Sequence, residues 1–170
     1  MKSENAMTTE QNTTLRAFRP ADVQAVRDLV LATIDVSFAG VYAPSAIAHF
    51  RRHHEVAEIL ADAAGGCTVV LERDGRIVAT GTLTGSGKIT RVYVRADLQG
   101  RGLGKRIMAH LERQARAAGR VSVHLNASLV ARRFYEALGY RLREAKCHTL
   151  EDGARLDYFE MDKPLTDTPP

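Results

Sequence analysis

Three glycines at alternate positions, Gly100, Gly102 and Gly104, form the segment of this chain that is most informative about chemistry. The β-branched run Ile89–Val94 precedes them and an amphipathic stretch to about residue 118 follows, so they mark a strand-to-helix turn. Because glycine has no Cβ atom, the backbone of such a turn approaches a ligand closely and points several N–H groups into one concavity. The helix that begins here adds unpaired N–H groups and the positive end of its dipole. The turn therefore predicts a site for a phosphate or pyrophosphate.

Two common phosphate-binding loops do not fit this spacing. The P-loop, G-x-x-x-x-G-K-[ST], needs one more residue between Gly100 and Gly104, and Arg106 stands where Ser or Thr must contact magnesium. The dinucleotide fingerprint G-x-G-x-x-G, read from Gly100, places Lys105 at its last glycine. Glycine content alone is as consistent with a flexible connection that binds nothing, but the flanking strand and helix favour a binding turn.

The segment Gln99–Gly104 resembles the [QR]-x-x-G-x-[GA] signature of the GNAT superfamily of acyl-CoA-dependent N-acyltransferases, with Asp97 also in the expected place. The resemblance implies that amides of this turn hold the pyrophosphate of acetyl-CoA. It also implies that the backbone of Val92 and Val94 pairs with the pantetheine arm like an added strand. The cofactor-binding residues implied in this segment are Val92, Tyr93, Val94, Gln99, Gly100, Arg101, Gly102, Leu103, Gly104 and Lys105.

A second segment, Asn126–Tyr140, resembles the strand–helix motif of the same family that ends in [FL]-Y-x-x-x-G-[FY]. The resemblance places the phenol of Tyr135 at the CoA sulfur. A phenol has an ordinary pKa of about 10, so it stays protonated at neutral pH and can donate a proton to a departing thiolate. Taken without the family, Phe134 and Tyr135 are more typical of core aromatics on an amphipathic helix.

The start of this second segment departs from the family pattern. Many relatives carry asparagine seven residues before the tyrosine, where this chain has Ser128, while Asn126 lies two residues earlier at the predicted strand end. We expect Asn126 to contact pantetheine. Ser128 is a second cofactor-binding candidate. Its alternative, purely structural role is to be the N-cap of a helix over Ser128–Leu138.

The general base is not evident from the sequence. Relatives often carry glutamate on the strand before the turn, whereas this chain has Lys88, Thr90 and Arg91 there. Proton loss through water to solvent is an equal alternative to a side-chain base. The side chains that remain candidates for the base are Asp35, Glu72 and His124.

Histidines and basic residues are the other chemically capable groups. His49 and His53 share a helical face, but no matching cysteine or carboxylate cluster accompanies them, so no metal site is predicted and they are expected to line the amine pocket or face solvent.

Arg101, Lys105 and Arg106 lie beside the expected pyrophosphate. No aromatic stripe interleaves these charges, so nucleic acid is not a predicted partner.

The pattern along the chain predicts the element order β-α-α-β-β-β-α-β-α-β-β. The first helix runs from 20–22 to Ile34, the second covers Ser45–Ala63, and Asp74-Gly75 predicts a hairpin turn. The fold class is α/β (α+β). The resemblance implies a GNAT-like mixed, mostly antiparallel sheet of six to seven strands, flanked by about four helices and splayed between its fourth and fifth strands.

Composition fits one globular domain. The chain has 170 residues, 45% of them hydrophobic, and a net charge of +4. We expect flexible tails over 1–13 and 164–170 and a single N-acetyltransferase domain over 14–163. No apolar run approaches the roughly 18 residues that a membrane helix needs, and the first residues are polar. Two cysteines far apart fit a reducing compartment, so the predicted location is cytoplasmic with no membrane partner.

These features lead to one expected activity and two alternatives. The expected activity is direct transfer of an acetyl group from acetyl-CoA to a primary amine of a small molecule, with Tyr135 as general acid, an N–H near Val94 polarising the thioester, and no metal. The alternatives are a protein or peptide N-acetyltransferase, and a non-catalytic acyl-CoA-binding module. The predicted partners are acetyl-CoA and the amine, and a second copy of the chain is kept as a potential partner.

Overall fold

The computed structural model describes residues 12–165, whose strands form one seven-stranded sheet in the order β1-β2-β3-β4-β5-β7-β6. Neighbouring strands are antiparallel except β4 and β5, which are parallel. This confirms the predicted mixed, mostly antiparallel sheet. The strands are β1 (Thr14–Ala17), β2 (Cys67–Arg73), β3 (Arg76–Leu83), β4 (Lys88–Val94), β5 (Ser122–Ser128), β6 (Arg141–Thr149) and β7 (Arg155–Pro164).

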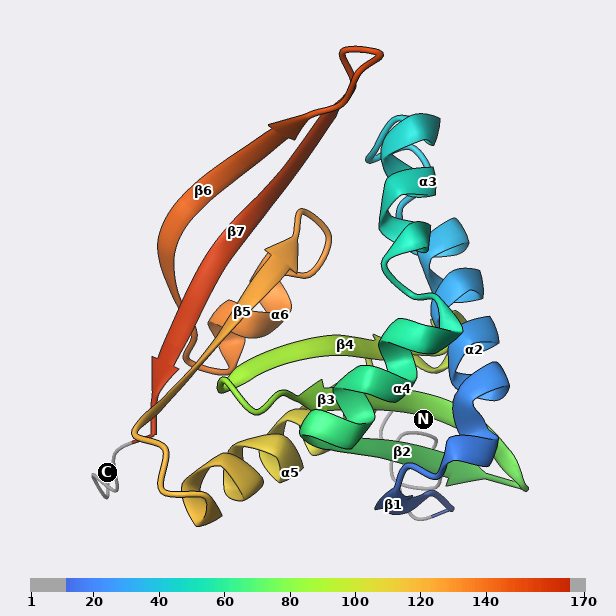
Figure 1. The fold of residues 1–170 in the computed structure, drawn as a ribbon, viewed down its shortest axis with the longest axis vertical. Helices are drawn as coiled ribbons and strands as arrows, with labels where there is room; N and C mark the ends of the chain where they lie inside the picture. Colours follow the sequence, from blue (N-terminus) through green and yellow to red (C-terminus); the bar gives the residue numbers. More distant parts are fainter. Residues whose placement is uncertain (1–11, 166–170) are drawn as a thin grey trace, which may run out of the picture.

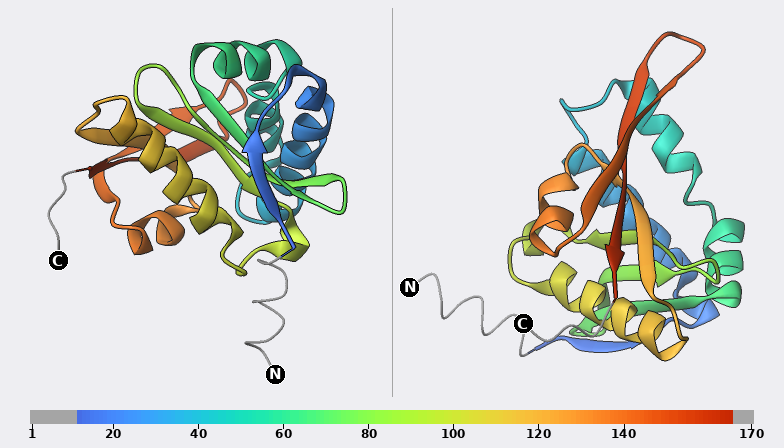
Figure 2. Two further views of the ribbon diagram at one scale, coloured as in Figure 1. Left: turned by 90° about the horizontal axis from the view of Figure 1, so that it is seen from below. Right: turned by 90° about the vertical axis from the view of Figure 1, so that its left-hand side faces the viewer.

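Helices cover both faces of this sheet (Figures 1 and 2). On one face α2, α3 and α4 bury Val26, Ile34 and Ile59 in a cluster with Val70 of β2. On the other face the larger core cluster joins α5 and α6 to the sheet. The helices are α2 (Val23–Ser37), α3 (Pro44–Arg52), α4 (Val56–Gly65), α5 (Leu103–Ala117) and α6 (Arg132–Ala137), with short 3-10 turns η1 (Pro20–Asp22) and η2 (Ala96–Leu98).

The sheet opens between β4 and β5. Their parallel ladder holds only the pairs Lys88↔His124 and Ile89↔Leu125. Beyond these pairs the two strands diverge, which Figure 1 shows. The predicted splay between the fourth and fifth strands is therefore confirmed, and it leaves the facing edges of both strands without a neighbouring strand.

The prediction of one helix over Ser45–Ala63 is wrong, because α3 ends at Arg52 and α4 begins at Val56. No glycine or proline separates them. Instead His54 turns inward, where it is 7% exposed and bonds to Arg91 and Tyr93 of β4. Glu55 then takes an extended conformation, with φ −72° and ψ 154°, and starts α4. A contact distant in sequence has overridden the local helical pattern.

The predicted helix start at Ser128 is also wrong. Ser128 is the last residue of β5, paired with Tyr158 of β7, and the helix begins at Arg132. The carbonyl of Ser128 accepts a hydrogen bond from the N–H of Ala131 at 3.1 Å, and its side chain caps nothing. The strand continues because seven consecutive pairs with β7 satisfy the backbone as far as Ser128.

The predicted tails lie outside the described residues except at their inner ends. Thr13 is buried and accepts hydrogen bonds from Arg106, and Leu165 is buried with its N–H on the carbonyl of Val121 at 2.7 Å. None of the helices in the described part is long and apolar enough to cross a membrane.

Candidate active site

The glycine turn brings unpaired amides together at the start of α5. Gly100 and Gly102 have φ of 73° and 85°, a left-handed conformation that glycine adopts without strain. The N–H of Arg106 bonds to the carbonyl of Gly102 at 3.0 Å, which closes the first turn of the helix. The N–H groups of Leu103, Gly104 and Lys105 therefore have no carbonyl of the helix to bond, and they carry the positive end of its dipole.

Gly104 serves a different purpose, which is close packing. A Cβ atom placed there would lie 3.0 Å from Cζ of Phe134, on α6. The start of α5 therefore rests against the ring that precedes Tyr135. The two sequence motifs, which are thirty residues apart in the chain, meet at this contact.

The open edge of β4 leads away from the turn. Val94 lies opposite Ala79 of β3, and the N–H of Arg95 bonds to the carbonyl of Val78 at 2.9 Å. In an antiparallel ladder this pattern directs the N–H and C=O of Val94 away from β3 and toward the splay. Gln99 returns from the turn and donates its side-chain amide to the Val94 carbonyl at 3.0 Å. The N–H of Val94 faces the splayed edge and forms no hydrogen bond with β3.

Tyr135 lies on the side of the splay that α5 covers. It is 7% exposed and its ring contacts those of Phe134 and Tyr140 at centroid distances of 5.0 and 5.7 Å. Burial raises the pKa of the Tyr135 phenol well above its ordinary value, and the nearby Tyr93 adds to the shift. Its hydroxyl forms no hydrogen bond with any described residue.

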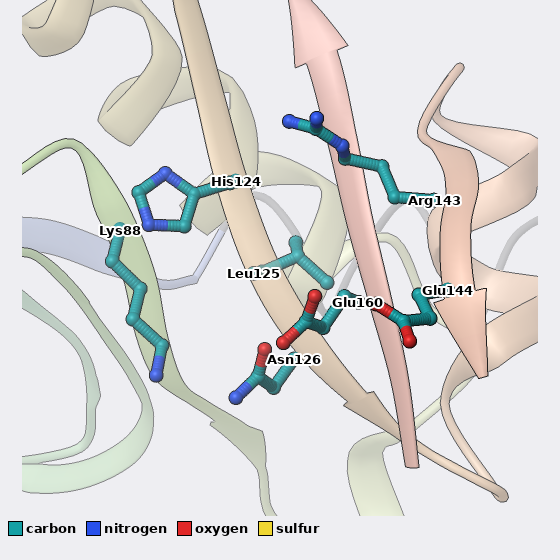
Figure 3. A pocket seen from close by; sticks show the side chains of 7 residues that line it. All are labelled: Lys88, His124, Leu125, Asn126, Arg143, Glu144 and Glu160. Atoms are coloured by element: carbon teal, nitrogen blue, oxygen red, sulfur yellow. The ribbon is translucent and has the colours of Figure 1, made fainter. Parts of the chain in front are cut away.

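A polar pocket of about 430 Å³ lies on the opposite face of β4 and β5 (Figure 3). Val123, Leu125 and Ala127 point into the core that α5 covers, so the alternating His124 and Asn126 point to the other face. Sequence reasoning found Asn126 and His124 but missed the residues that β6 and β7 contribute, because only the register brings them alongside. The pocket is lined by Lys88, His124, Leu125, Asn126, Arg143, Glu144 and Glu160.

Two of the three predicted base candidates are engaged elsewhere. Asp35 pairs with Arg51 at 2.5 Å, and Glu72 pairs with Arg16 of the edge strand β1 at 2.8 Å. Neither carboxylate lines the polar pocket. The third candidate, His124, does line it.

A buried hydrogen-bond network supports β4 from the side of α3 and α4. Arg91, with φ of 53°, donates from Nε to Nδ1 of His54 at 3.1 Å and from Nη1 to Asp62 at 3.0 Å. Since a guanidinium can only donate, Nδ1 of His54 is an acceptor and its Nε2 carries the hydrogen that faces the Tyr93 hydroxyl at 3.3 Å. Burial first, and the Arg91 charge second, lower the pKa of His54 to about 3, so this imidazole is neutral.

Tyr42 closes the same side of the splay. It lies in the loop between α2 and α3, is 6% exposed, and donates its hydroxyl to the carbonyl of Asp157 at 2.8 Å. The same oxygen accepts the N–H of Leu129, just after β5, at 2.8 Å. One phenol therefore ties the α2–α3 loop to β5 and β7.

The histidines of α3 meet the tip of the β6–β7 hairpin. Nε2 of His49 and Nε2 of His53 are 3.1 Å apart, and the His49 ring lies 5.6 Å from that of His148. Burial and the neighbouring positive groups lower the pKa of His49. Over residues 12–165, no group of three or more His, Cys, Asp or Glu side chains has the geometry to hold a metal ion.

The cations near the turn divide into two roles. The Arg106 side chain donates to the carbonyl and hydroxyl of Thr13, so it ties the residue before β1 to α5. Arg101 lines a second hollow of about 680 Å³ beside the turn. This hollow is rich in arginine and is lined by Arg73, Asp74, Arg76, Val78, Arg95, Asp97, Leu98 and Arg101.

Comparison with known proteins agrees with this geometry. An uncharacterized acetyltransferase of Streptococcus pyogenes serotype M3 is 37% identical over 89 residues, which cover 50% of this chain and 61% of that protein. A GCN5-related N-acetyltransferase from Rhodopseudomonas palustris superposes with a TM-score of 0.81 and 25% identity, over 90% of this chain and 96% of that one. The PaiA N-acetyltransferase of Thermoplasma acidophilum, solved with coenzyme A, superposes with a TM-score of 0.72 and 15% identity, over 89% and 98%.

The family defined as "Acetyltransferase (GNAT) domain" matches residues 38–163, which include the glycine turn, the splay, Tyr135 and the polar pocket. This chain therefore belongs to the GNAT acetyltransferases.

Proposed function

We propose that this protein transfers an acetyl group from acetyl-CoA to a primary amine of a small molecule. One observation supports the proposal. The opening between β4 and β5 has the amide-rich turn at the start of α5 on one face, where Tyr135 of α6 is buried, and a polar pocket on the opposite face. The coenzyme A bound to the PaiA N-acetyltransferase supports the choice of donor.

The donor would occupy the side of the splay that α5 covers. Free amides of Leu103, Gly104 and Lys105, reached through Gly100 and Gly102, would bind the pyrophosphate. The open edges at Val92 and Val94, on the strand that also carries Tyr93, would pair with the pantetheine amides, with Asn126 and Ser128 on the facing strand. Gln99 positions the turn on β4, and Arg101 adds positive charge beside it.

Acetyl transfer needs three events: loss of a proton from the amine, stabilisation of the charge on the thioester oxygen, and protonation of the leaving sulfur. The acceptor must be a neutral amine when it attacks the thioester carbon, so a proton leaves it first. A backbone N–H at the splayed edge near Val94 stabilises the charge that develops on the carbonyl oxygen. Tyr135, which burial keeps protonated, donates to the sulfur as the carbon–sulfur bond breaks.

The acceptor side favours a small molecule over a peptide. Tyr42 fastens the α2–α3 loop to the ends of β5 and β7, and His49 packs near His148 at the hairpin tip. These contacts bring the α2–α3 loop and α3 close to β5, β7 and the β6–β7 hairpin, and so leave less room between them for an extended peptide. A protein or peptide acceptor, or a module that binds acyl-CoA without reaction, gives different outcomes in the experiment below.

Two measurements test the proposal. Acetyl-CoA at about one hundred times its Kd stabilises a protein that binds it by about 2.7 kcal/mol, which for a chain of this size raises Tm by several degrees. Release of free thiol is then followed with a panel of small amines and peptides. Turnover with small amines supports the proposal, turnover with peptides alone favours the second candidate, and binding without turnover favours the third. The absence of any Tm shift with acetyl-CoA contradicts all three.

A further inference from the structure

Glu160 of β7 is a partly buried carboxylate that forms no direct salt bridge with any described residue, although Lys146 of β6 attracts it electrostatically. Its neighbours are committed, since Glu144 pairs with Lys146 at 3.0 Å and Asp162 pairs with Arg143 at 3.2 Å. Across residues 12–165, Glu160 itself forms no ion pair and no hydrogen bond. With no direct hydrogen bond or ion pair from those residues on its oxygens, this carboxylate is available to accept a proton from a ligand in the pocket.

The register places Glu160 beside the point where the sheet opens. Asn126 is the first residue of β5 beyond the last pair with β4, and Glu160 is its partner on β7. Figure 3 shows the Glu160 and Asn126 side chains next to one another on the wall of the pocket. The carboxylate therefore faces the splay from the side opposite α5, where an acceptor can reach a thioester held on the other side.

We propose that Glu160 is the general base that takes the proton from the acceptor ammonium. This inference rests on the proposed acetyl transfer. The carboxylate accepts one proton from the ammonium, directly or through one water, and leaves a neutral amine. The amine nitrogen bonds to the acetyl carbon as the carbon–sulfur bond breaks, and Tyr135 gives its proton to the sulfur. The second nitrogen proton restores the phenol, and Glu160 releases its proton to solvent.

Other titratable and charged groups face Glu160 from each neighbouring strand. Lys88 comes from β4, His124 from β5, and Arg143, Glu144 and Lys146 from β6, while Tyr158 and Asp162 flank it on β7. Histidine is the other residue type here that can accept a proton near neutral pH. The experiment therefore includes His124 as well as Glu160.

The decisive variant is Glu160→Gln, which keeps the size of the side chain and removes its basicity. At pH 7 we expect kcat/KM for the amine to fall by about 10²- to 10⁴-fold, with acetyl-CoA affinity and Tm unchanged. As pH rises toward the pKa of the acceptor amine, the ratio of wild-type to variant rates should shrink, because free amine no longer needs a base. Glu160→Asp should recover part of the rate, and added formate should partly restore Glu160→Ala.

The matched control is Asp162→Asn, which removes a carboxylate two residues along the same strand, outside the pocket lining. It should leave the pH profile unchanged. If Glu160→Gln behaves like Asp162→Asn while the wild type is active, Glu160 is not the base. The same conclusion follows if His124→Gln, and not Glu160→Gln, shows the pH-dependent loss. A wild-type protein that releases no thiol with any amine overturns the proposed function itself, together with this inference.

Discussion

At the scale of single residues, Tyr135 is the side chain whose environment is best matched to its proposed task. Burial raises its pKa, and its hydroxyl is left without a partner among the described residues. Tyr135→Phe removes only the hydroxyl and keeps the ring packed between Phe134 and Tyr140. We expect kcat to fall about tenfold or more with near-normal acetyl-CoA affinity, as measured by steady-state kinetics and calorimetry. Equal turnover would remove Tyr135 from the mechanism.

His54 predicts a pH dependence of stability. Its pKa is about 3 when folded and about 6.5 in an unfolded chain, so between these values the unfolded state binds more protons. The stability that the neutral imidazole contributes is complete above pH 6.5 and is lost as pH falls toward 3. The limiting slope from this group is about 1.4 kcal/mol per pH unit.

Urea unfolding at pH 7 and pH 5 measures this slope. The matched variant is His54→Gln, whose side chain does not titrate, so the free energy of unfolding should depend less on pH than in the wild type. Carboxylates such as Asp22, whose pKa the Arg16 hydrogen bond lowers, lose stability in the same direction and are common to both proteins. Equal slopes in the two proteins would show that His54 titrates alike in both states.

The sequence predicts some of these residues and misses others for a physical reason. Gly100, Gly102 and Tyr135 belong to local motifs, in which spacing along the chain determines geometry. Glu160 is brought beside Asn126 by the pairing of β7 with β5, and Tyr42 is held by a loop contact with Asp157, so both positions depend on residues more than thirty places away in the chain. No rule of sequence spacing predicts such pairs. The sequence therefore did not identify the general base, and two of its candidates, Asp35 and Glu72, form ion pairs with arginines in the structure.

At the scale of elements, the break between α3 and α4 shows how a tertiary contact replaces a local signal. The sequence pattern predicts a continuous helix, whereas Arg91 and Tyr93 of β4 draw His54 inward and end α3. Arg91 keeps a left-handed φ that costs a non-glycine residue about 1–2 kcal/mol. The three side-chain contacts of its guanidinium hold it there, and it forms the bulge at which β4 departs from regular pairing with β3.

The packing of α5 on the sheet depends on a glycine in β3. A Cβ atom at Gly81 would lie 2.5 Å from Ile107 and 3.1 Å from Leu111, both buried residues of α5. Gly81→Ala therefore forces the helix or its side chains to move, and we expect the free energy of unfolding to fall by about 1–3 kcal/mol. Urea unfolding measures it.

The matched control for this change is Gly65→Ala. Gly65 ends α4 and has no positive φ, and a Cβ atom added to it would meet no other atom within 4 Å. The substitution should leave stability unchanged or raise it by up to about 1 kcal/mol, since alanine favours the helix. A Gly81 variant as stable as the Gly65 variant would show that α5 does not rest on β3 as closely as the structure has it.

At the scale of the whole molecule, two half-sheets are held together at a narrow junction. Strands β1 to β4 and strands β5 to β7 share only the two residue pairs between β4 and β5. On one face the core that includes α5 and α6 spans both halves. On the other face the hydroxyl of Tyr42 links the α2–α3 loop to Leu129 and Asp157 of the second half. The splay can thus stay open for ligands while both faces bridge it.

Tyr42→Phe tests whether this bridge shapes the acceptor site. The variant keeps the ring packed against Phe38 and Phe50 but loses both hydrogen bonds, so we expect a loss of about 0.5–1.5 kcal/mol in stability. The loop should then sample positions away from β7, which raises KM for the amine several-fold and leaves acetyl-CoA affinity unchanged. Tyr140→Phe is the matched control, because it breaks a hydrogen bond to Glu112 within the other core. It should lower stability without raising KM for the amine. If both variants change KM alike, the acceptor site responds to general loosening of the fold and not to the Tyr42 bridge.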